Sequence, residues 1–423
     1  MEPKPFRMAE FMGKNNVLQP EMTKPNEFQV VKNVYVNDAR KIRRRKGYHR
    51  VYTGSVHSLF SNGDFILFRE GTDLKRLEPD YSGTPIRSGI TAGRPMRYQE
   101  IADRLFFTDG VITGVYQNGA CRSWGLEVPE RPALTAIGGS LSEGKYQITL
   151  TFLRNDGQES GAPASTLIDL PADSGILIDN ISMSMDPTVV GVNIYLTATN
   201  GEVPFFVATV LNGTRNLAYS GDGKGVSPCV TQFMEAPPPG QLLTYYQGRI
   251  YIAAGSVLYY TEKDYMVELA SLHKAFIPWP SRITMLGAVR NGIWISTLSE
   301  IGFIAGDPGS SEVRYQPVAR YGAIEGTCVE VDGPNIGDGS IAGHALLWTT
   351  PLGICVGGQD GLFKNLTAGR VVFPAVVSGV GAIKQEEDAS LYVVGLYFSN
   401  VGLGTLAALT AYGEGYESAP PPP

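Results

Sequence analysis

The side chains best suited to binding a partner through charge lie in one short stretch, Ala39–Arg50, which reads ARKIRRRKGYHR. Seven of its twelve residues are Lys or Arg. The strand-like runs VVKNVYVN and GYHRVYTG flank it, which disfavours a flexible targeting signal. Two interpretations stay open: an edge strand protected from aggregation by charge, or a contact with a phosphate backbone or an acidic partner. The candidate contact residues are Arg40, Lys41, Arg43, Arg44, Arg45 and Lys46.

No catalytic motif accompanies this stretch. The sequence contains no HExxH, GxSxG, P-loop or Rossmann fingerprint. The four histidines are far apart in sequence: His49, His57, His273 and His344. Asp109, Asp307 and Asp360 lie in TDG, GDPG and QDG, contexts in which Asp is favoured by β-turns. We therefore predict that the protein is not an enzyme, although two carboxylates from distant segments could still converge as in glycoside hydrolases.

The cysteines give no sign of a metal site. Cys121, Cys229, Cys328 and Cys355 are scattered, and none forms a CxxC pair. We expect four reduced, buried thiols made in a reducing cytosol. No metal and no cofactor is predicted.

Charge is distributed unevenly along the chain. The first 60 residues hold 12 Lys or Arg against 5 Asp or Glu, whereas the other 363 hold 23 against 36. A mildly acidic body argues against a general nucleic-acid-binding protein. No run of about 18 apolar residues occurs, so no membrane anchoring is predicted.

Most of the chain is predicted to form short β-strands separated by turns that contain Gly, Asn or Asp. One segment, KDYMVELASLHKAF at 263–276, has the apolar spacing of an amphipathic helix. Apolar strands recur at intervals of about 40–53 residues, which is the length of a four-stranded propeller blade. These strands begin near Phe65, Leu105, Ile250, Ile293, Leu346 and Tyr392.

One interval is longer by about 100 residues, which indicates an insertion. The segment KYQITLTFLRNDGQESG alternates apolar and polar residues and places Tyr146, Ile148, Leu150 and Phe152 on one face. About seven short strands in this length are typical of a fibronectin- or Ig-like β-sandwich.

We therefore predict an all-β chain, a six-bladed β-propeller with an inserted sandwich. An N-terminal strand before the first blade is expected to close the ring by pairing with the last blade. The expected parts are an arm (1–27), the closing strand and two blades (28–131), the sandwich (132–236), four blades (237–400) and a C-terminal tail (401–423).

The order of several segments resembles that in the tail nozzle, or hub, proteins of short-tailed bacteriophages, also described as packaged-DNA stabilisation proteins. The segments are NVYVNDARKIRRRKGY, HSLFSNGDFILF, RLFFTDG, WGLEVPERP, GGSLSEGKYQITLTFLRNDGQESGA, NIYLTATNG, PPPGQLLTYYQGRIYIAAGSVLYYTE and GIWISTLSEIGFIAGD. The likeness spans roughly residues 25–400 and depends on their order, since no single segment is specific.

The resemblance implies a structural virion protein, assembled in the host bacterial cytoplasm, that forms a ring, usually a homo-hexamer, at the end of the tail. Such a ring surrounds the DNA exit channel, retains packaged DNA and opens on ejection. Its partners would be adaptor and portal proteins, tail fibres or spikes, and DNA without sequence specificity. The basic stretch would face the DNA or an acidic neighbour. The alternative is a propeller tail protein that binds or hydrolyses host surface polysaccharide.

Overall fold

The computed structural model describes residues 10–37, 39–221, 225–310, 313–386 and 389–398, and the backbone of 407–410. The described chain is all-β, with strands joined by turns and by short 3-10 helices. These helices are η1 (Pro20–Met22), η2 (Asp264–Met266), η3 (Gly333–Ile336) and η4 (Gln359–Gly361). Within the described residues, no helix has the length and apolar character that a membrane span needs.

The helix expected at 263–276 does not form; only η2 is helical there. Asp264 has φ +56°, a left-handed conformation that does not continue a right-handed helix. Glu235 and Ala270 then exchange two backbone hydrogen bonds of 2.9 and 2.8 Å. These bonds hold the segment as an extended loop against the chain that returns from the insertion, so tertiary pairing overrides the apolar periodicity.

Consecutive strands form four-stranded antiparallel sheets in a simple meander. The first contains β3 (Val56–Ser61), β4 (Ile66–Glu70), β5 (Asp73–Leu77) and β6 (Gly83–Arg87). The second contains β7 (Arg97–Ile101), β8 (Arg104–Thr108), β9 (Thr113–Gln117) and β10 (Ala120–Arg122). The third contains β18 (Leu242–Tyr246), β19 (Arg249–Ala254), β20 (Val257–Tyr260) and β21 (Phe276–Pro278).

The same pattern continues to the end of the described chain. The fourth sheet contains β22 (Ile283–Val289), β23 (Gly292–Thr297), β24 (Ile301–Ala305) and β25 (Arg314–Ala319). The fifth contains β26 (Val329–Asp332), β27 (His344–Thr350), β28 (Gly353–Gly357) and β29 (Phe363–Asn365). The last has three strands, β30 (Val376–Glu386), β31 (Ala389–Phe398) and β32 (Ala407–Thr410). A succession of such sheets is like that of propeller blades.

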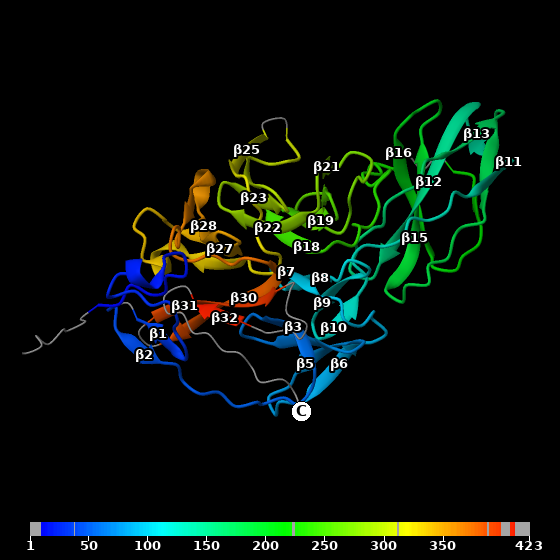
Figure 1. Cartoon of the computed structure of the whole chain (residues 1–423). Helices are drawn as coiled ribbons and strands as arrows, with labels where there is room; N and C mark the ends of the chain where they lie inside the picture. The colour runs from blue at the N-terminus through cyan, green and yellow to red at the C-terminus, as the bar shows by residue number, and fades with distance from the viewer. Residues whose placement is uncertain are drawn as a thin grey trace, which may run out of the picture.

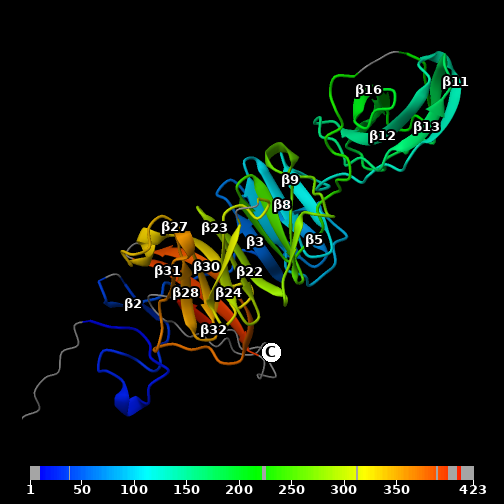
Figure 2. The ribbon, with the colours of Figure 1, turned by 90° about the horizontal axis from the view of Figure 1, so that it is seen from above.

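The second strand of each sheet shows why the sheets pack face to face. Successive side chains of a strand point to opposite faces, and along β8 the buried Phe107 packs against the first sheet while Phe106 packs against the third. Likewise on β23, Ile293 faces the third sheet and Trp294 the fifth. Both faces of these sheets are therefore apolar, and the second to fifth sheets are each packed between two neighbouring sheets (Figure 2).

The N-terminal strand differs from the prediction. Among the described residues, β1 (Val34–Val36) pairs with β2 (Ile42–Arg44) and with no strand of the last sheet. The chain turns back on itself because the Asn37 Oδ1 accepts the backbone N–H of Lys41 at 2.9 Å. The resulting hairpin contacts the last sheet through side chains instead, with Tyr35 packed on Ala389 and Leu391 of β31.

The described part of the predicted N-terminal arm, residues 10–27, is held against the loop that follows β29. The Asn16 side chain exchanges two 3.0 Å hydrogen bonds with the backbone of Val372, and Arg370 Nη1 donates to the carbonyl of Met12 at 2.9 Å. Most of the predicted C-terminal tail, 401–423, lies outside the described residues.

A separate pair of sheets is inserted between the second and third sheets (Figure 1). One contains β11 (Ala133–Leu141), β14 (Ser174–Asp179) and β17 (Leu217–Tyr219). The other contains β13 (Thr166–Leu170), β12 (Gly144–Arg154), β15 (Val189–Thr197) and β16 (Pro204–Leu211). They share one apolar core, to which the four predicted residues of β12 contribute, Tyr146, Ile148, Leu150 and Phe152. We call the other sheets the main body and this pair the inserted sheets.

Candidate functional site

The basic stretch 39–50 forms the second half of the N-terminal hairpin and the chain that leaves it. All three residues of β2 are exposed, including the apolar Ile42. The hairpin is held in place from the β1 side, where Tyr35 is buried and the Arg45 N–H donates to the carbonyl of Asn33 at 3.1 Å. The structure thus presents the stretch at the surface on a short, fixed hairpin.

Acidic residues of the same chain already contact part of this charge. Arg40 Nη1 lies 3.2 Å from Glu10 Oε2, and Lys46 Nζ lies 3.6 Å from Glu386 Oε2. The pKa of Glu386 is lowered, first by the hydrogen bond from Lys384 and further by Lys46. Arg43 and Arg45 also have interaction partners.

Lys41 and Arg44 differ from the rest of the stretch. Both side chains are exposed, and no hydrogen bond or ion pair within the described ranges involves either of them. Of the six predicted contact residues, these two are the most available to a second molecule. The self-repulsion of the stretch is thus relieved in part by its own chain, and the surface left for a partner is smaller than seven charges suggested.

The predicted turn aspartates sit apart in loops of different sheets. Asp109 accepts the N–H groups of Val111 and Ile112 at 2.9 Å each, and Asp307 accepts that of Gly309 at 2.9 Å. The turn interpretation is confirmed for these two. Asp360 accepts a 2.7 Å hydrogen bond from the Asn291 amide. In the part of the chain that is described, no group of three or more His, Cys, Asp or Glu has the arrangement of a metal site.

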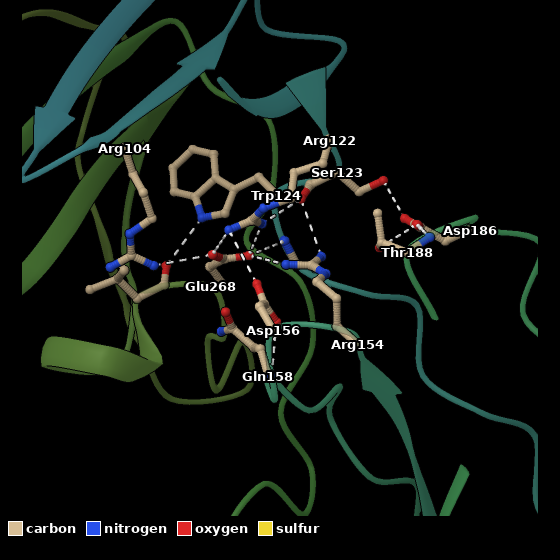
Figure 3. Close-up of polar contacts among 12 residues, drawn as sticks. Arg104, Arg122, Ser123, Trp124, Arg154, Asp156, Gln158, Asp186, Thr188 and Glu268 are labelled. Carbon is tan, nitrogen blue, oxygen red and sulfur yellow. Dashed lines mark hydrogen bonds and ion pairs between the residues drawn. The ribbon is translucent and has the colours of Figure 1, made fainter. Parts of the chain in front are cut away.

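Sequence reasoning missed a buried charge cluster where the inserted sheets meet the main body (Figure 3). Glu268, which is fully buried, lies in the loop between β20 and β21. Arg122 at the end of β10 holds it with two 2.6 Å hydrogen bonds. Arg154 of β12 donates at 2.7 Å, and Arg104 of β8 at 3.2 Å. We call these four residues the Glu268 cluster.

The cluster fixes Glu268 in its ionised form. Burial alone would raise the pKa of Glu268, but the hydrogen bonds and charges of Arg122 and Arg154 outweigh it, so the pKa is lowered overall. Bidentate and charge-assisted hydrogen bonds of this kind are the strong ones in proteins. Both carboxylate oxygens accept hydrogen bonds from guanidinium groups, and these bonds join the main body to the inserted sheets.

The surrounding chain is built to admit this carboxylate. Gly125 has φ +78°, and a Cβ there would lie 2.6 Å from the Glu268 carbonyl oxygen and 2.8 Å from the Ala236 Cβ. Trp124 Nε1 donates to the carbonyl of Val267 at 3.1 Å, and Ser123 Oγ donates to Asp186 of the inserted sheets at 2.7 Å. The sequence signal for this cluster was Glu268, the single charged residue in the apolar run MVELASL. Its arginine partners lie 114 to 164 residues away in the chain, so the sequence did not indicate them.

Comparisons with known proteins identify no relative by sequence. No protein-family model matches the chain, and no curated protein matches it. Among solved structures, BBS1N in complex with ARL6DN has 14% identity, covers 92% of this chain and 98% of its own, and has a TM-score of 0.30. The N-terminal domain of Nup159 has 9% identity, coverages of 84% and 73%, and a TM-score of 0.28.

A third similar structure is the extracellular domain of the hybrid two-component system BT4673 from B. thetaiotaomicron. It has 12% identity, covers 90% of this chain and 56% of its own, and has a TM-score of 0.25. Similarities this low carry no argument about what the chain does.

Proposed function

We propose that the chain is a six-bladed β-propeller with an Ig- or fibronectin-like sandwich inserted between its second and third blades. The alternation of side chains along the second strands supports this assignment, because the second to fifth sheets each face two neighbouring sheets. The sixth sheet has three strands, and Tyr35 of the N-terminal hairpin packs on the face of β31 opposite the fifth sheet. In the proposed ring this hairpin would lie between the sixth and first blades.

We further propose that the protein is a structural subunit of a bacteriophage tail nozzle. It would form a ring, a homo-hexamer, around the DNA exit channel, retain the packaged genome and open on ejection. Adaptor and portal proteins and tail fibres or spikes would be its neighbours in the virion. The observation that carries the proposal is the position of the inserted sheets after the second sheet of the main body, because that order is the basis of the resemblance.

The Glu268 cluster suits this role. A subunit that resists internal pressure must not let its inserted part swing, and a buried carboxylate held by arginines from both parts opposes such motion. The exposed hairpin with Lys41 and Arg44 supplies a cationic surface for an acidic neighbour in the ring or for DNA sliding past it.

Electron microscopy of the source particle tests the proposal directly. We expect density for this chain on the tail axis with cyclic symmetry, and light scattering of the purified chain at increasing concentration should show a ring-sized species. A chain found as an isolated monomer at the tip of a fibre would contradict the assignment.

The role of the hairpin has its own test. The double variant Lys41→Glu/Arg44→Glu should weaken ring assembly or DNA retention, measured as subunits per particle and as DNA released on mild heating. A matched control is Lys145→Glu/Arg215→Glu, which makes the same charge change at exposed positions of the inserted sheets. Equal behaviour of the two double variants would remove the hairpin from the proposed interface.

A further inference from the structure

A small cavity between the first strands of the main-body sheets contains an arginine with no partner. The cavity has a volume of about 180 Å³ and is lined by β7, β18, β22 and β26, and by the chain before β26. Arg97 of β7 lines it, and its Nε is buried without a hydrogen bond. Across the described ranges, no hydrogen bond or ion pair involves the Arg97 side chain.

Within the described ranges, no acidic side chain forms an ion pair with Arg97. The thiol of Cys328 is the titratable group whose charge would act on Arg97. Burial raises the pKa of this thiol to about 12, so the thiol is neutral at neutral pH. Glu330 also lines the cavity, yet its carboxylate lies 3.9 Å from His344 and is exposed. A guanidinium stays protonated at neutral pH even where burial lowers the pKa of Arg97.

Gly326 borders the cavity beside Arg97, where the backbone of the last sheet approaches closely. Gly326 has φ +87°, and a Cβ there would lie 3.6 Å from Arg97 Nη2 and only 2.1 Å from the carbonyl oxygen of Gly379. Thr244 also lines the cavity, and its hydroxyl accepts the N–H of Ala288 at 3.0 Å, which leaves its own hydrogen to donate. Two residues with donor groups, Arg97 and Thr244, therefore line one small space, and Arg97 brings a positive charge to it.

We propose that this cavity binds a small inorganic oxyanion, phosphate or sulfate, on Arg97. Buried donors in folded proteins are almost always paired, so the unpaired Arg97 Nε in the wall of a cavity indicates a missing acceptor. The volume suits one tetrahedral ion rather than a nucleotide. This site is independent of the tail-nozzle proposal, because it is internal to one chain.

Thermal unfolding of the full chain in inorganic phosphate tests the site. Phosphate is titrated from 0 to about 20 mM at constant ionic strength balanced with chloride, because a ligand of the folded state raises the unfolding temperature in proportion to ln(1 + [L]/Kd). We expect a saturable rise for the native chain, none for Arg97→Met, and a weaker rise for Arg97→Lys. Glu330→Gln removes a nearby negative charge and should lower the half-saturating phosphate concentration severalfold.

Arg76→Met is the matched control, because Arg76 of β5 is also partly buried with an unpaired Nε but does not line this cavity. It should keep the native phosphate response. A rise that persists in Arg97→Met, or no rise in the native chain, overturns the proposal. A selenate soak of crystals gives a second measurement that needs no variant: anomalous density beside Arg97 supports the site, and its absence at saturating selenate contradicts it.

Discussion

Glu268 is one residue whose removal should loosen two parts of the molecule at once. It is fully buried and contacts arginines of the main body and of the inserted sheets. Glu268→Gln leaves the fully buried Arg154 and the mostly buried Arg122 without their countercharge, and breaking a buried pair in this way costs about 3–5 kcal/mol. Urea unfolding should show a loss of that size, whereas Glu330→Gln, at an exposed carboxylate, should change the unfolding free energy by less than about 1 kcal/mol.

Acid should remove the same contribution. The pKa of Glu268 is lowered from its ordinary value of 4.5, so its ionised form stabilises the fold at neutral pH. That stabilisation is present above pH 4.5 and is lost as the pH falls through the lowered pKa of the folded state. We expect the unfolding free energy of the native chain to fall more steeply below pH 4.5 than that of Glu268→Gln. Parallel pH profiles would contradict the role given to this carboxylate.

The four thiols should react slowly in the folded protein. Burial raises the pKa of Cys121 to about 11 and those of Cys328 and Cys355 to about 12, and it also raises the pKa of Cys229. Because the thiolate is the reactive form, a thiol reagent at pH 8 should modify the native chain far more slowly than the urea-unfolded chain. Rapid modification of a single native cysteine, located by mass spectrometry, would show that its surroundings are more open than described.

At the scale of elements, the sheets depend on neighbouring side chains that face opposite ways. Trp294 of β23 and Trp348 of β27 belong to adjacent sheets, are both fully buried, and have ring centroids 5.5 Å apart. Each Trp→Leu change should destabilise the protein, and the double variant should lose less than the sum of the two by about 0.5–1.5 kcal/mol. A pair in non-adjacent sheets, Phe106→Leu with Trp348→Leu, is the additive control.

The strands could be predicted from the sequence because successive side chains of a strand point to opposite faces, and this pattern is visible within a few residues. Residues such as Ile293 and Trp294 are both apolar, which indicates a strand buried on both faces. The partner of the N-terminal strand could not be predicted in the same way. Asn37 closes a turn that pairs the strand with its own continuation, and the choice between two possible partners depends on that turn's geometry.

The candidate site was predictable only where it was continuous in sequence. The basic stretch is visible as a run of charges, but its acidic partners Glu10 and Glu386 are distant in the chain. Glu268 and Arg97 each read as an ordinary charged residue in a strand or loop. The role of each residue depends on its burial and on the groups that the fold places beside it. Burial and distant neighbours leave no local pattern in the sequence.

At the scale of the whole molecule, the inserted sheets leave and rejoin the main body at nearly one point, since a Cβ at Gly125 would touch Ala236. Replacing 127–235 with a short Gly-Ser linker should therefore yield a folded main body. We expect circular dichroism to show retained β structure, with stability reduced by the loss of Arg154 from Glu268. Aggregation of this variant, together with aggregation of a second one that also carries Glu268→Leu, would show that the main body cannot fold alone.

The closeness of those two chain positions has a consequence for how such proteins diversify. An inserted domain whose two chain ends lie close together can be lost, enlarged or exchanged by recombination without a change in the fold of the main body. The surface of the inserted domain would then vary between related proteins, while the main body stays constant. Each new inserted domain would have to supply a cation in place of Arg154 as a partner for Glu268.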